Sequence, residues 1–191
     1  MINYPNKKQH KETKITSSAN RGMNFESMIN RTNEFYLDND IAIIHKKPIP
    51  IQIVGVDYKK RSAARITEAY YKLPSTTDYN GIYKGLYIDF EVKETKSKTS
   101  FPIKNIHEHQ VLHLKRVNEH GAISFVIVYF SALERIYLLD SKLLTLYYER
   151  SKTGKKSISI DEFEENAHLI KEGYRKPVDY LSIIDKFYIK K

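Results

Sequence analysis

Hydrophobic and polar positions alternate most clearly from Leu86 to Lys93, and this period of two predicts a β-strand. Its apolar residues share one face and its charged residues the other: Ile88, Phe90 and Val92 against Asp89, Glu91 and Lys93. Asn80-Gly81 and Lys84-Gly85 are turn signals, so the strand is predicted to form one arm of a β-hairpin that starts near Thr76. The charged face is expected to point into solvent or into a cleft.

Apolar residues at helical spacing, together with capping residues, predict helices on either side of this hairpin. The helices are expected after Asn24 to about Leu37, after Asn105 to about Glu119 with Gly121 beyond it, from Asp140 to about Arg150, a short one capped by Asp161 with Glu164, and a last one capped by Asp179 with Leu181, Ile184, Phe187 and Tyr188 as its core face. Strands are expected over 41–44, 51–56, 122–129 and 135–139, and the third is apolar enough to be buried on both faces. This order predicts an α/β fold in which a mixed central sheet is flanked by helices.

The charge of the chain indicates what kind of molecule the protein binds. The 191 residues fit one domain, expected over 21–191, and 32 Lys and Arg against 23 Asp and Glu give a net charge of +9. This balance favours nucleic acid as the partner, ahead of an anionic membrane surface. There is no Cys, which excludes disulfides and thiolate zinc sites. With no apolar run near the length of a membrane span and no signal peptide, we expect a soluble cytoplasmic protein with no membrane partner.

Two segments lack the apolar periodicity of a core element. Residues 1–20 are polar and basic, and they are expected to be either a flexible arm that orders on nucleic acid or simply a disordered terminus. Residues 57–75 carry five cations and three Tyr between two predicted strands, where a short loop would suffice. Cations suit phosphates and rings suit exposed bases, so this insertion is interpreted as a nucleic-acid contact rather than a solvated loop.

The charged face of the hairpin also carries candidate chemistry. Glu91 and Lys93 lie two positions apart on one strand face, about 6.6 Å along the backbone, and the hairpin can bring Asp78 beside Glu91. Two carboxylates can hold a hard cation such as Mg²⁺, and a lysine can stabilise charge in phosphodiester hydrolysis. The adjacent pair Glu94 and Lys96 falls on the apolar face, so it is expected to mark the end of the strand. An amphipathic hairpin with a solvated charged face explains the same spacing, and the spacing alone does not decide between the two.

Other acidic and imidazole side chains give weaker indications. Glu26, in the first turn of the first helix, either faces the metal cleft or favours the helix dipole, and the dipole is the preferred interpretation. His107, His109 and His113 are expected to be mostly solvated, because no His-Glu-x-x-His motif is present and Mg²⁺ prefers oxygen ligands.

Several motifs in succession give the chain a family resemblance. They are Asn20-Arg-Gly-Met, His45-Lys-Lys-Pro-x-Pro, Thr76-Thr-Asp-Tyr-Asn-Gly-Ile-Tyr-Lys-Gly, Ile88-Asp-Phe-Glu-x-Lys-Glu-Thr, Thr99-Ser-Phe-Pro and Asp179-Tyr-x-Ser-Ile-Ile. Together they closely resemble the RecU-type Holliday junction resolvases of low-GC Gram-positive bacteria and some of their phages. The resemblance runs over nearly the whole chain, and it favours the nuclease interpretation over a solvated hairpin.

The resemblance implies a restriction-endonuclease-like fold of the PD-(D/E)xK superfamily and a homodimer that nicks two opposing strands of a four-way DNA junction, leaving 5′-phosphates, in recombination and repair. It implies Mg²⁺, with Mn²⁺ as a substitute, at Thr76, Asp78, Glu91 and Gln110, and a transition-state lysine at Lys93. Residues 57–75 correspond to a stalk that enters the junction, and the expected DNA contacts are Arg21, Lys59, Lys60, Arg61, Arg65, Tyr70 and Tyr71. Thr77 stands where the name of the motif has Pro, a departure that RecU-type sequences share.

The same resemblance leaves two alternatives open. The first is a junction-binding, strand-annealing or recombinase-modulating role without catalysis, and recombinase and branch-migration proteins are implied as further partners. The second is an endonuclease of the same fold that acts on linear duplex. Competition between the two DNA forms at matched salt would separate the second from a junction resolvase.

Overall fold

A six-stranded mixed sheet forms the centre of the computed structural model, which describes residues 24–58, 60, 63–72 and 76–189. Its strands, in spatial order, are β1 (Ile43–Lys46), β4 (Tyr79–Tyr83), β5 (Leu86–Thr95), β7 (Ile123–Phe130), β8 (Arg135–Asp140) and β10 (His168–Ile170). Strands β5 and β7 pair in parallel, and every other pair is antiparallel. The predicted mixed sheet is confirmed. The predicted arm over 1–20 and three predicted DNA contacts, Arg21, Lys59 and Arg61, lie outside the described residues.

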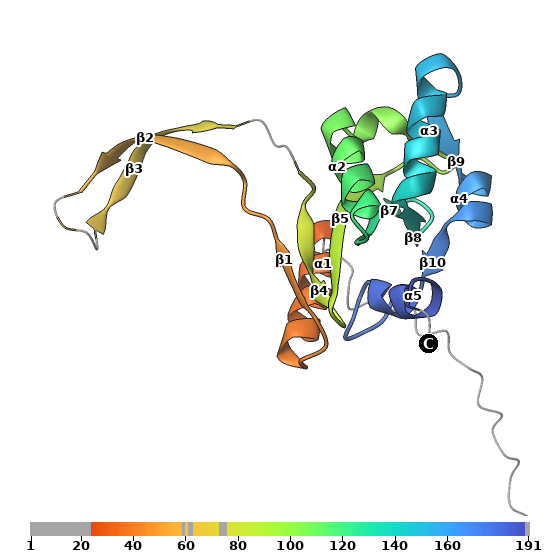
Figure 1. The fold of residues 1–191 in the computed structure, drawn as a ribbon, viewed down its shortest axis with the longest axis horizontal. Helices are drawn as coiled ribbons and strands as arrows, with labels where there is room; N and C mark the ends of the chain where they lie inside the picture. The colour runs from red at the N-terminus through yellow and green to blue at the C-terminus, as the bar shows by residue number, and fades with distance from the viewer. Residues whose placement is uncertain (1–23, 59, 61–62, 73–75, 190–191) are drawn as a thin grey trace, which may run out of the picture.

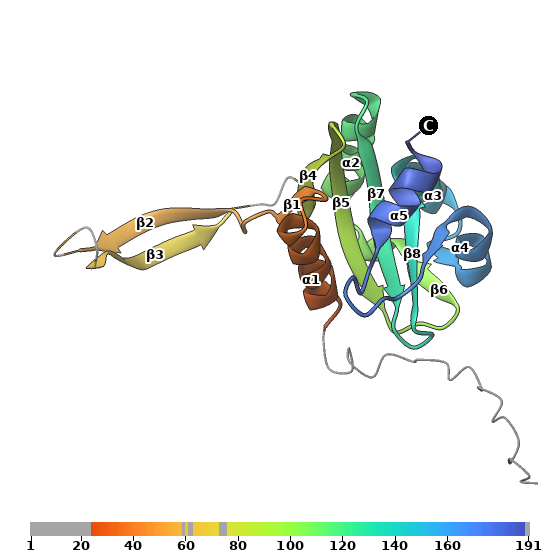
Figure 2. The same cartoon turned by 90° about the horizontal axis from the view of Figure 1, so that it is seen from below.

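Helices cover both faces of the sheet, as Figures 1 and 2 show. Helices α1 (Phe25–Asp38) and α5 (Tyr180–Phe187) pack on one face, and α2 (Glu108–Glu119), α3 (Ser141–Thr153) and α4 (Ile160–Asn166) pack on the other. The first core contains a stack of Tyr79, Phe90 and Phe125, with ring centroids 5.0 and 4.9 Å apart. Strand β7 contributes to both cores, which confirms that it is buried on both faces. In the described part of the chain, no helix is long and apolar enough to cross a membrane.

A two-stranded antiparallel ribbon projects from this body (Figures 1 and 2). It consists of β2 (Ile51–Asp57) and β3 (Arg65–Tyr71), and we call it the stalk. Nearly all of its described side chains are exposed. The predicted start of the insertion at residue 57 is therefore too late, because the stalk begins at Ile51. The strand expected over 51–56 is present, but it pairs within the stalk and not with the central sheet.

The predicted hairpin is present, with one of its two turn signals misassigned. Lys84 and Gly85 form the turn, with φ values of 50° and 77°. Asn80 and Gly81 instead lie inside β4, where Gly81 faces Ile44 of β1 and Ile88 of β5. A Cβ at position 81 would lie 2.0 Å from the carbonyl oxygen of Ile43, so the close approach of β1 requires glycine here.

The observed helix N-termini confirm some of the capping predictions and correct others. The Asn24 side chain accepts a hydrogen bond from the Ser27 N–H at 2.7 Å, which confirms the first cap. Asn105 does not cap α2, because it lies in the short 3₁₀-helix η3 (Ile103–Asn105) and His107 holds the N-cap position. Asp179 does hold the N-cap position of α5, but its side chain accepts from the Tyr36 hydroxyl at 2.7 Å and makes no capping hydrogen bond.

The C-terminal third contains further corrections. The cap of α4 is Ser159 with Glu162, not Asp161 with Glu164, and Ser159 belongs to the short strand β9 (Ser157–Ser159), which pairs with β6 (Ser100–Pro102). Phe187 was predicted in the core but is 50% exposed, and its ring stacks on His168. A hydrophobic period places a residue on a helix face, but it does not tell whether the sheet extends far enough to cover that residue.

Candidate active site

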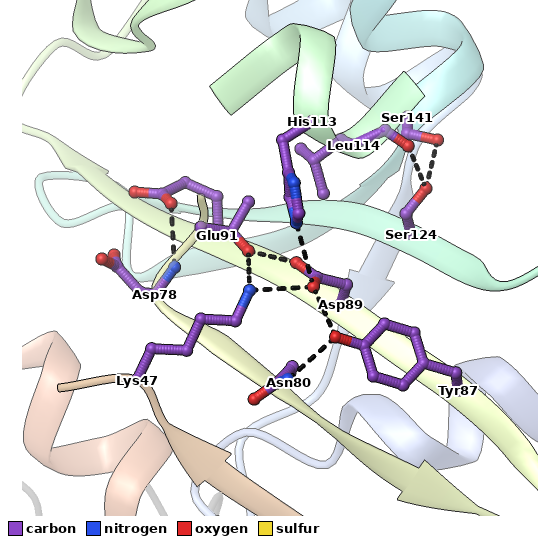
Figure 3. A network of polar contacts seen from close by, with 11 residues as sticks. Lys47, Asp78, Asn80, Tyr87, Asp89, Glu91, His113, Leu114, Ser124 and Ser141 are labelled. Atoms are coloured by element: carbon purple, nitrogen blue, oxygen red, sulfur yellow. Dashed lines mark hydrogen bonds and ion pairs between the residues drawn. The ribbon is translucent and has the colours of Figure 1, made fainter. Parts of the chain in front are cut away.

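The hairpin brings two acidic side chains together at the start of β4. Tyr79 pairs with Phe90, so the residues just beyond them, Asp78 and Glu91, are neighbours across the two strands. The backbone N–H of Asp78 donates a hydrogen bond to Oε2 of Glu91 at 3.2 Å (Figure 3). This confirms that the hairpin places Asp78 beside Glu91, as the spacing predicted.

Glu91 is fully buried rather than solvated, as are Asp89 on the same strand face and Phe90 on the other. Helix α2 packs over this part of β5, and the charged face of the strand therefore lies under protein. Burial raises the pKa of Glu91 to about 7, which Lys93 opposes and Asp78 reinforces. The carboxyl group is poised between its protonated and ionised forms near neutral pH.

Lys93 completes the cluster that the sequence predicted. Its Nζ lies 2.8 Å from Oε1 of Glu91, which is an ion-pair distance, and its side chain is 21% exposed. Oε1 is buried, and Lys93 is its ion-pair partner. A buried carboxylate with a second carboxylate and a lysine beside it fits a site that is completed by a cation.

A second, larger network surrounds Asp89, two positions before Glu91 (Figure 3). Its carboxylate accepts from Lys47 Nζ at 2.8 Å and from the Tyr87 hydroxyl at 3.0 Å, and it also contacts the Thr77 hydroxyl and His113 Nε2. Burial alone would raise the pKa of Asp89, but the hydrogen bonds from His113, Lys47 and Thr77 outweigh it and lower the pKa. Sequence reasoning placed Asp89 on the correct face but gave it no role, because three of these partners are distant in the chain.

The other two predicted metal ligands are less closely tied to the acidic pair. Thr76 is exposed, and Gln110 is 6% exposed. The Gln110 side-chain oxygen accepts from the His107 backbone N–H at 3.1 Å, so in this structure it caps α2. Within the described residues, neither side chain bonds to Asp78 or Glu91, and no cluster of three or more His, Cys, Asp or Glu side chains could hold a metal.

The histidines of α2 are not all solvated, and the prediction is wrong for His113. His113 Nε2 lies 3.2 Å from Oδ2 of Asp89, which draws this ring into the buried network. His107 is exposed, and its ring is stacked against that of half-buried His109, with centroids 5.4 Å apart. Because α2 lies over β5, its inward face reaches the polar cluster, a consequence of packing that helical spacing alone could not show.

Glu26 forms an ion pair with Lys46 at 2.5 Å, at the point where α1 meets the end of β1. Burial raises the pKa of Tyr79, and the charges of Glu26, Asp78 and Glu91 raise it further. Glu26 thus serves both in the first turn of α1 and in the electrostatics around the acidic pair.

The predicted DNA contacts that the structure describes lie on the stalk strands or, for Lys60, between them. They are Lys60, Arg65, Tyr70 and Tyr71, and each is exposed. Tyr71 is 83% exposed, and the Tyr70 hydroxyl donates to Glu68 at 2.5 Å. Their roles in binding stay predictions.

Comparison with known proteins decides the family. The family model described as "RecU: Recombination protein U" matches residues 20–186. The chain belongs to the RecU family. Curated RecU relatives from Geobacillus sp. WCH70, Bacillus subtilis 168 and Oceanobacillus iheyensis are 50%, 52% and 53% identical to it. Each alignment covers 98% of this chain and 98%, 96% and 100% of the relative, respectively, and each relative carries the name Holliday junction resolvase RecU.

A solved structure of the Archaeoglobus fulgidus Holliday junction resolvase Hjc is a more distant likeness. It aligns with 73% of this chain and 92% of its own, at 12% sequence identity and a TM-score of 0.41. The RecU relatives, at about half identity over the full length, are what define the family here.

Proposed function

We propose that this protein is a metal-dependent endonuclease that resolves four-way DNA junctions by paired symmetric nicks. The observation that carries the proposal is the convergence of Asp78, buried Glu91 and Lys93 at one end of the hairpin, in a chain of the RecU family. Phosphodiester hydrolysis needs the charge neutralisation and the water activation that such a cluster can support. The same family membership does not favour a role limited to binding junctions.

The donor set at Glu91 suits a hard, oxygen-seeking ion. Asp78 and Glu91 would hold it, and Mg²⁺ is the proposed ion, with Mn²⁺ as a substitute. The burial of the Glu91 carboxylate beside Asp78 supports this assignment. The chemistry that such an ion supplies when bound is neutralisation of phosphate charge and a more acidic bound water. Thr76 and Gln110 are proposed as further ligands, and for Gln110 this would require its side chain to leave the α2 cap.

The chain's own groups have distinct tasks in this proposal. Lys93 reaches the cluster from solvent, and its ammonium can donate hydrogen bonds to the attacking water or to the scissile phosphate. Glu91 must be ionised to act as a ligand, and Lys93 favours that form by lowering its pKa. Asp78 receives its position from its backbone N–H and C=O, so its carboxylate is oriented by the start of β4.

The stalk supplies the proposed contact with the centre of the junction. Its exposed cations and rings suit phosphates and unpaired bases, and it projects well away from the body (Figure 2). A homodimer would present two identical sites to a roughly two-fold junction, which accounts for symmetric nicks. Recombinase and branch-migration proteins are proposed as further partners.

The test is incubation of the protein with an end-labelled synthetic four-way junction, with Mg²⁺ and with EDTA, followed by denaturing and native gels. Paired nicks at symmetric positions that need Mg²⁺ are the expected result. Cleavage of a matched linear duplex at equal rate and salt would contradict the junction preference. Tight junction binding without cleavage in Mg²⁺ or Mn²⁺ would contradict the nuclease assignment.

A further inference from the structure

The segment that carries Asp78 is also one leg of the stalk. The chain leaves the body after β1, at Lys46, runs out as the stalk, and re-enters at Thr76 to Asp78. Figure 1 shows both legs meeting the body beside β4. A proposed metal ligand therefore sits where a long projecting ribbon joins the domain, and motion of the ribbon would displace it unless the root is fixed.

The Asp89 network fixes this root. Lys47 Nζ bonds both Oγ1 of Thr77 at 2.9 Å and Oδ2 of Asp89 at 2.8 Å, and the Thr77 hydroxyl itself donates to Oδ1 of Asp89. The Lys47 backbone N–H also donates to the carbonyl oxygen of Asp78 at 2.7 Å. Lys47 belongs to the outgoing leg, Thr77 and Asp78 to the returning leg, and Asp89 to the sheet, so three separate segments are joined at one point.

Asp89 is suited to be the fixed member of this arrangement. Its side chain is fully buried, and it lies at the centre of the sheet on β5 with Tyr87 and His113 as additional partners. A buried carboxylate with several donors has little freedom to move, because any displacement would break charge-assisted hydrogen bonds. The positions of Thr77 and Lys47 therefore depend on the position of Asp89.

Asp78 is consequently held on three sides without using its own carboxylate. Its N–H is bonded to Glu91, its C=O to Lys47, and the preceding side chain, Thr77, to Asp89 and Lys47. The superfamily motif has Pro at position 77, and a proline ring stiffens the backbone by fixing φ. Here the hydroxyl of buried Thr77 holds the segment through hydrogen bonds with Lys47 and Asp89.

We infer that Thr77, Lys47 and Asp89 form a positioning clamp that holds Asp78 in register with Glu91 at the root of the stalk. The inference rests on the proposed nuclease site. The three residues would not contact the reacting phosphate. They would act by holding Asp78 in place. Groups that orient metal ligands commonly change metal affinity or activity by 10- to 100-fold.

The sharpest test changes only the hydroxyl. Thr77→Val removes the link between the Asp78 segment and the clamp but keeps the size of the side chain and the Lys47–Asp89 ion pair. We expect Mn²⁺ affinity, measured without DNA from the electron paramagnetic resonance signal of the free ion, to fall about tenfold. Single-turnover cleavage of a four-way junction at subsaturating Mg²⁺ should fall by at least tenfold, and junction binding in EDTA should stay within twofold of wild type.

Two comparison variants separate positioning from simple stability. Thr77→Ser keeps the hydroxyl and should recover most of the metal affinity, although it loses a methyl group. Asp185→Asn removes a carboxylate that accepts from Lys84 at 2.6 Å and Tyr83 at 2.8 Å, a pattern like that of Asp89, but it touches neither leg of the stalk. It should leave Mn²⁺ affinity and cleavage within twofold.

The outcomes distinguish this inference from the proposed function. If wild type cleaves the junction and Thr77→Val matches it in both Mn²⁺ affinity and cleavage, the clamp is wrong and the nuclease assignment stands. If wild type does not cleave but binds Mn²⁺, and Thr77→Val weakens that binding, the clamp stands and the nuclease assignment fails. If Thr77→Val does not fold, Lys47→Met takes its place in the same measurements. Lys84→Met, which removes the ion pair with Asp185, is its control for charge.

Discussion

The backbone N–H of Asp78 bonds Oε2 of Glu91 at 3.2 Å, so two carboxylate residues separated by 13 positions share one end of a β-hairpin. Only the main chain of Asp78 makes this contact. A substitution of the Asp78 side chain therefore leaves this contact in place, and Glu91→Gln keeps an acceptor oxygen for it, so the site can be tested without unfolding the protein.

Glu91→Gln should abolish junction cleavage. The amide keeps the shape of the buried side chain but removes the charge that a cation requires. We expect single-turnover rates to fall by about 1,000-fold or more, as for loss of an essential catalytic group, while junction binding in EDTA changes less than twofold. Cleavage at wild-type rate would show that Glu91 is not a ligand.

The pKa of Glu91 gives a stability prediction of defined sign. Its pKa is about 7 in the folded protein and about 4.5 when unperturbed, so the folded state binds the proton more tightly. Between pH 4.5 and 7 the free energy of unfolding of the metal-free wild type should therefore fall relative to that of Glu91→Gln, by about 2–3 kcal/mol in total. Urea unfolding at pH 4.5, 6 and 8 in EDTA measures this difference. A difference that is constant with pH would mean that Glu91 titrates normally.

Lys93→Met should move this titration to higher pH as well as slow cleavage. Lys93 lowers the pKa of Glu91, so its removal leaves the buried carboxyl harder to ionise. The pKa of Glu91, followed by carbon NMR of the carboxyl group, should rise above 7, and cleavage should fall about 100-fold or more. Lys96→Met, at an exposed position just past the end of β5, is the control and should change neither quantity.

The stalk is predicted to contribute to junction binding but little to the stability of the fold. Tyr71→Ala should weaken junction binding by about 5- to 100-fold if the ring stacks on a base, and Arg61→Ala should weaken it as well. Because Tyr71 is 83% exposed, its truncation should shift the Tm by less than about 2 °C. Tyr174→Ala replaces a ring that is 68% exposed on the body of the protein and serves as the matched control. Wild-type junction affinity in both stalk variants would refute the role of the stalk.

Gly81→Ala should be strongly destabilising although the change is one methyl group. The new Cβ would lie 2.0 Å from the Ile43 carbonyl oxygen and 2.6 Å from the Ile44 Cα, so β1 must move or detach. We expect a loss of at least about 2 kcal/mol in urea unfolding. Ile82→Ala, at the adjacent and largely exposed position, should cost less than about 1 kcal/mol. Equal, small costs would show that β1 yields easily.

Local patterns in the sequence were sufficient for the five α-helices that the structure describes, for most strands of the central sheet and for the pairing of Asp78 with Glu91. Strand parity placed Glu91 and Lys93 on one face, and the hairpin length brought Asp78 opposite. The Asn24 cap and the apolar run of β7 were equally local, because each depends on neighbours within a few residues. Family motifs added Thr76 and Gln110, whose role as ligands remains a prediction.

Only the tertiary structure decided how deeply the site is buried and what holds it. Glu91 acquires its raised pKa because α2, from a later part of the chain, covers β5, and no periodicity in β5 announces that cover. In the sequence, Asp89 is an ordinary charged residue on a strand. Only the fold brings Lys47, Thr77 and His113, from three other segments, into contact with it. The stalk likewise depended on whether residues 51–57 pair with the central sheet or with residues 65–71, and long-range pairing settles that choice.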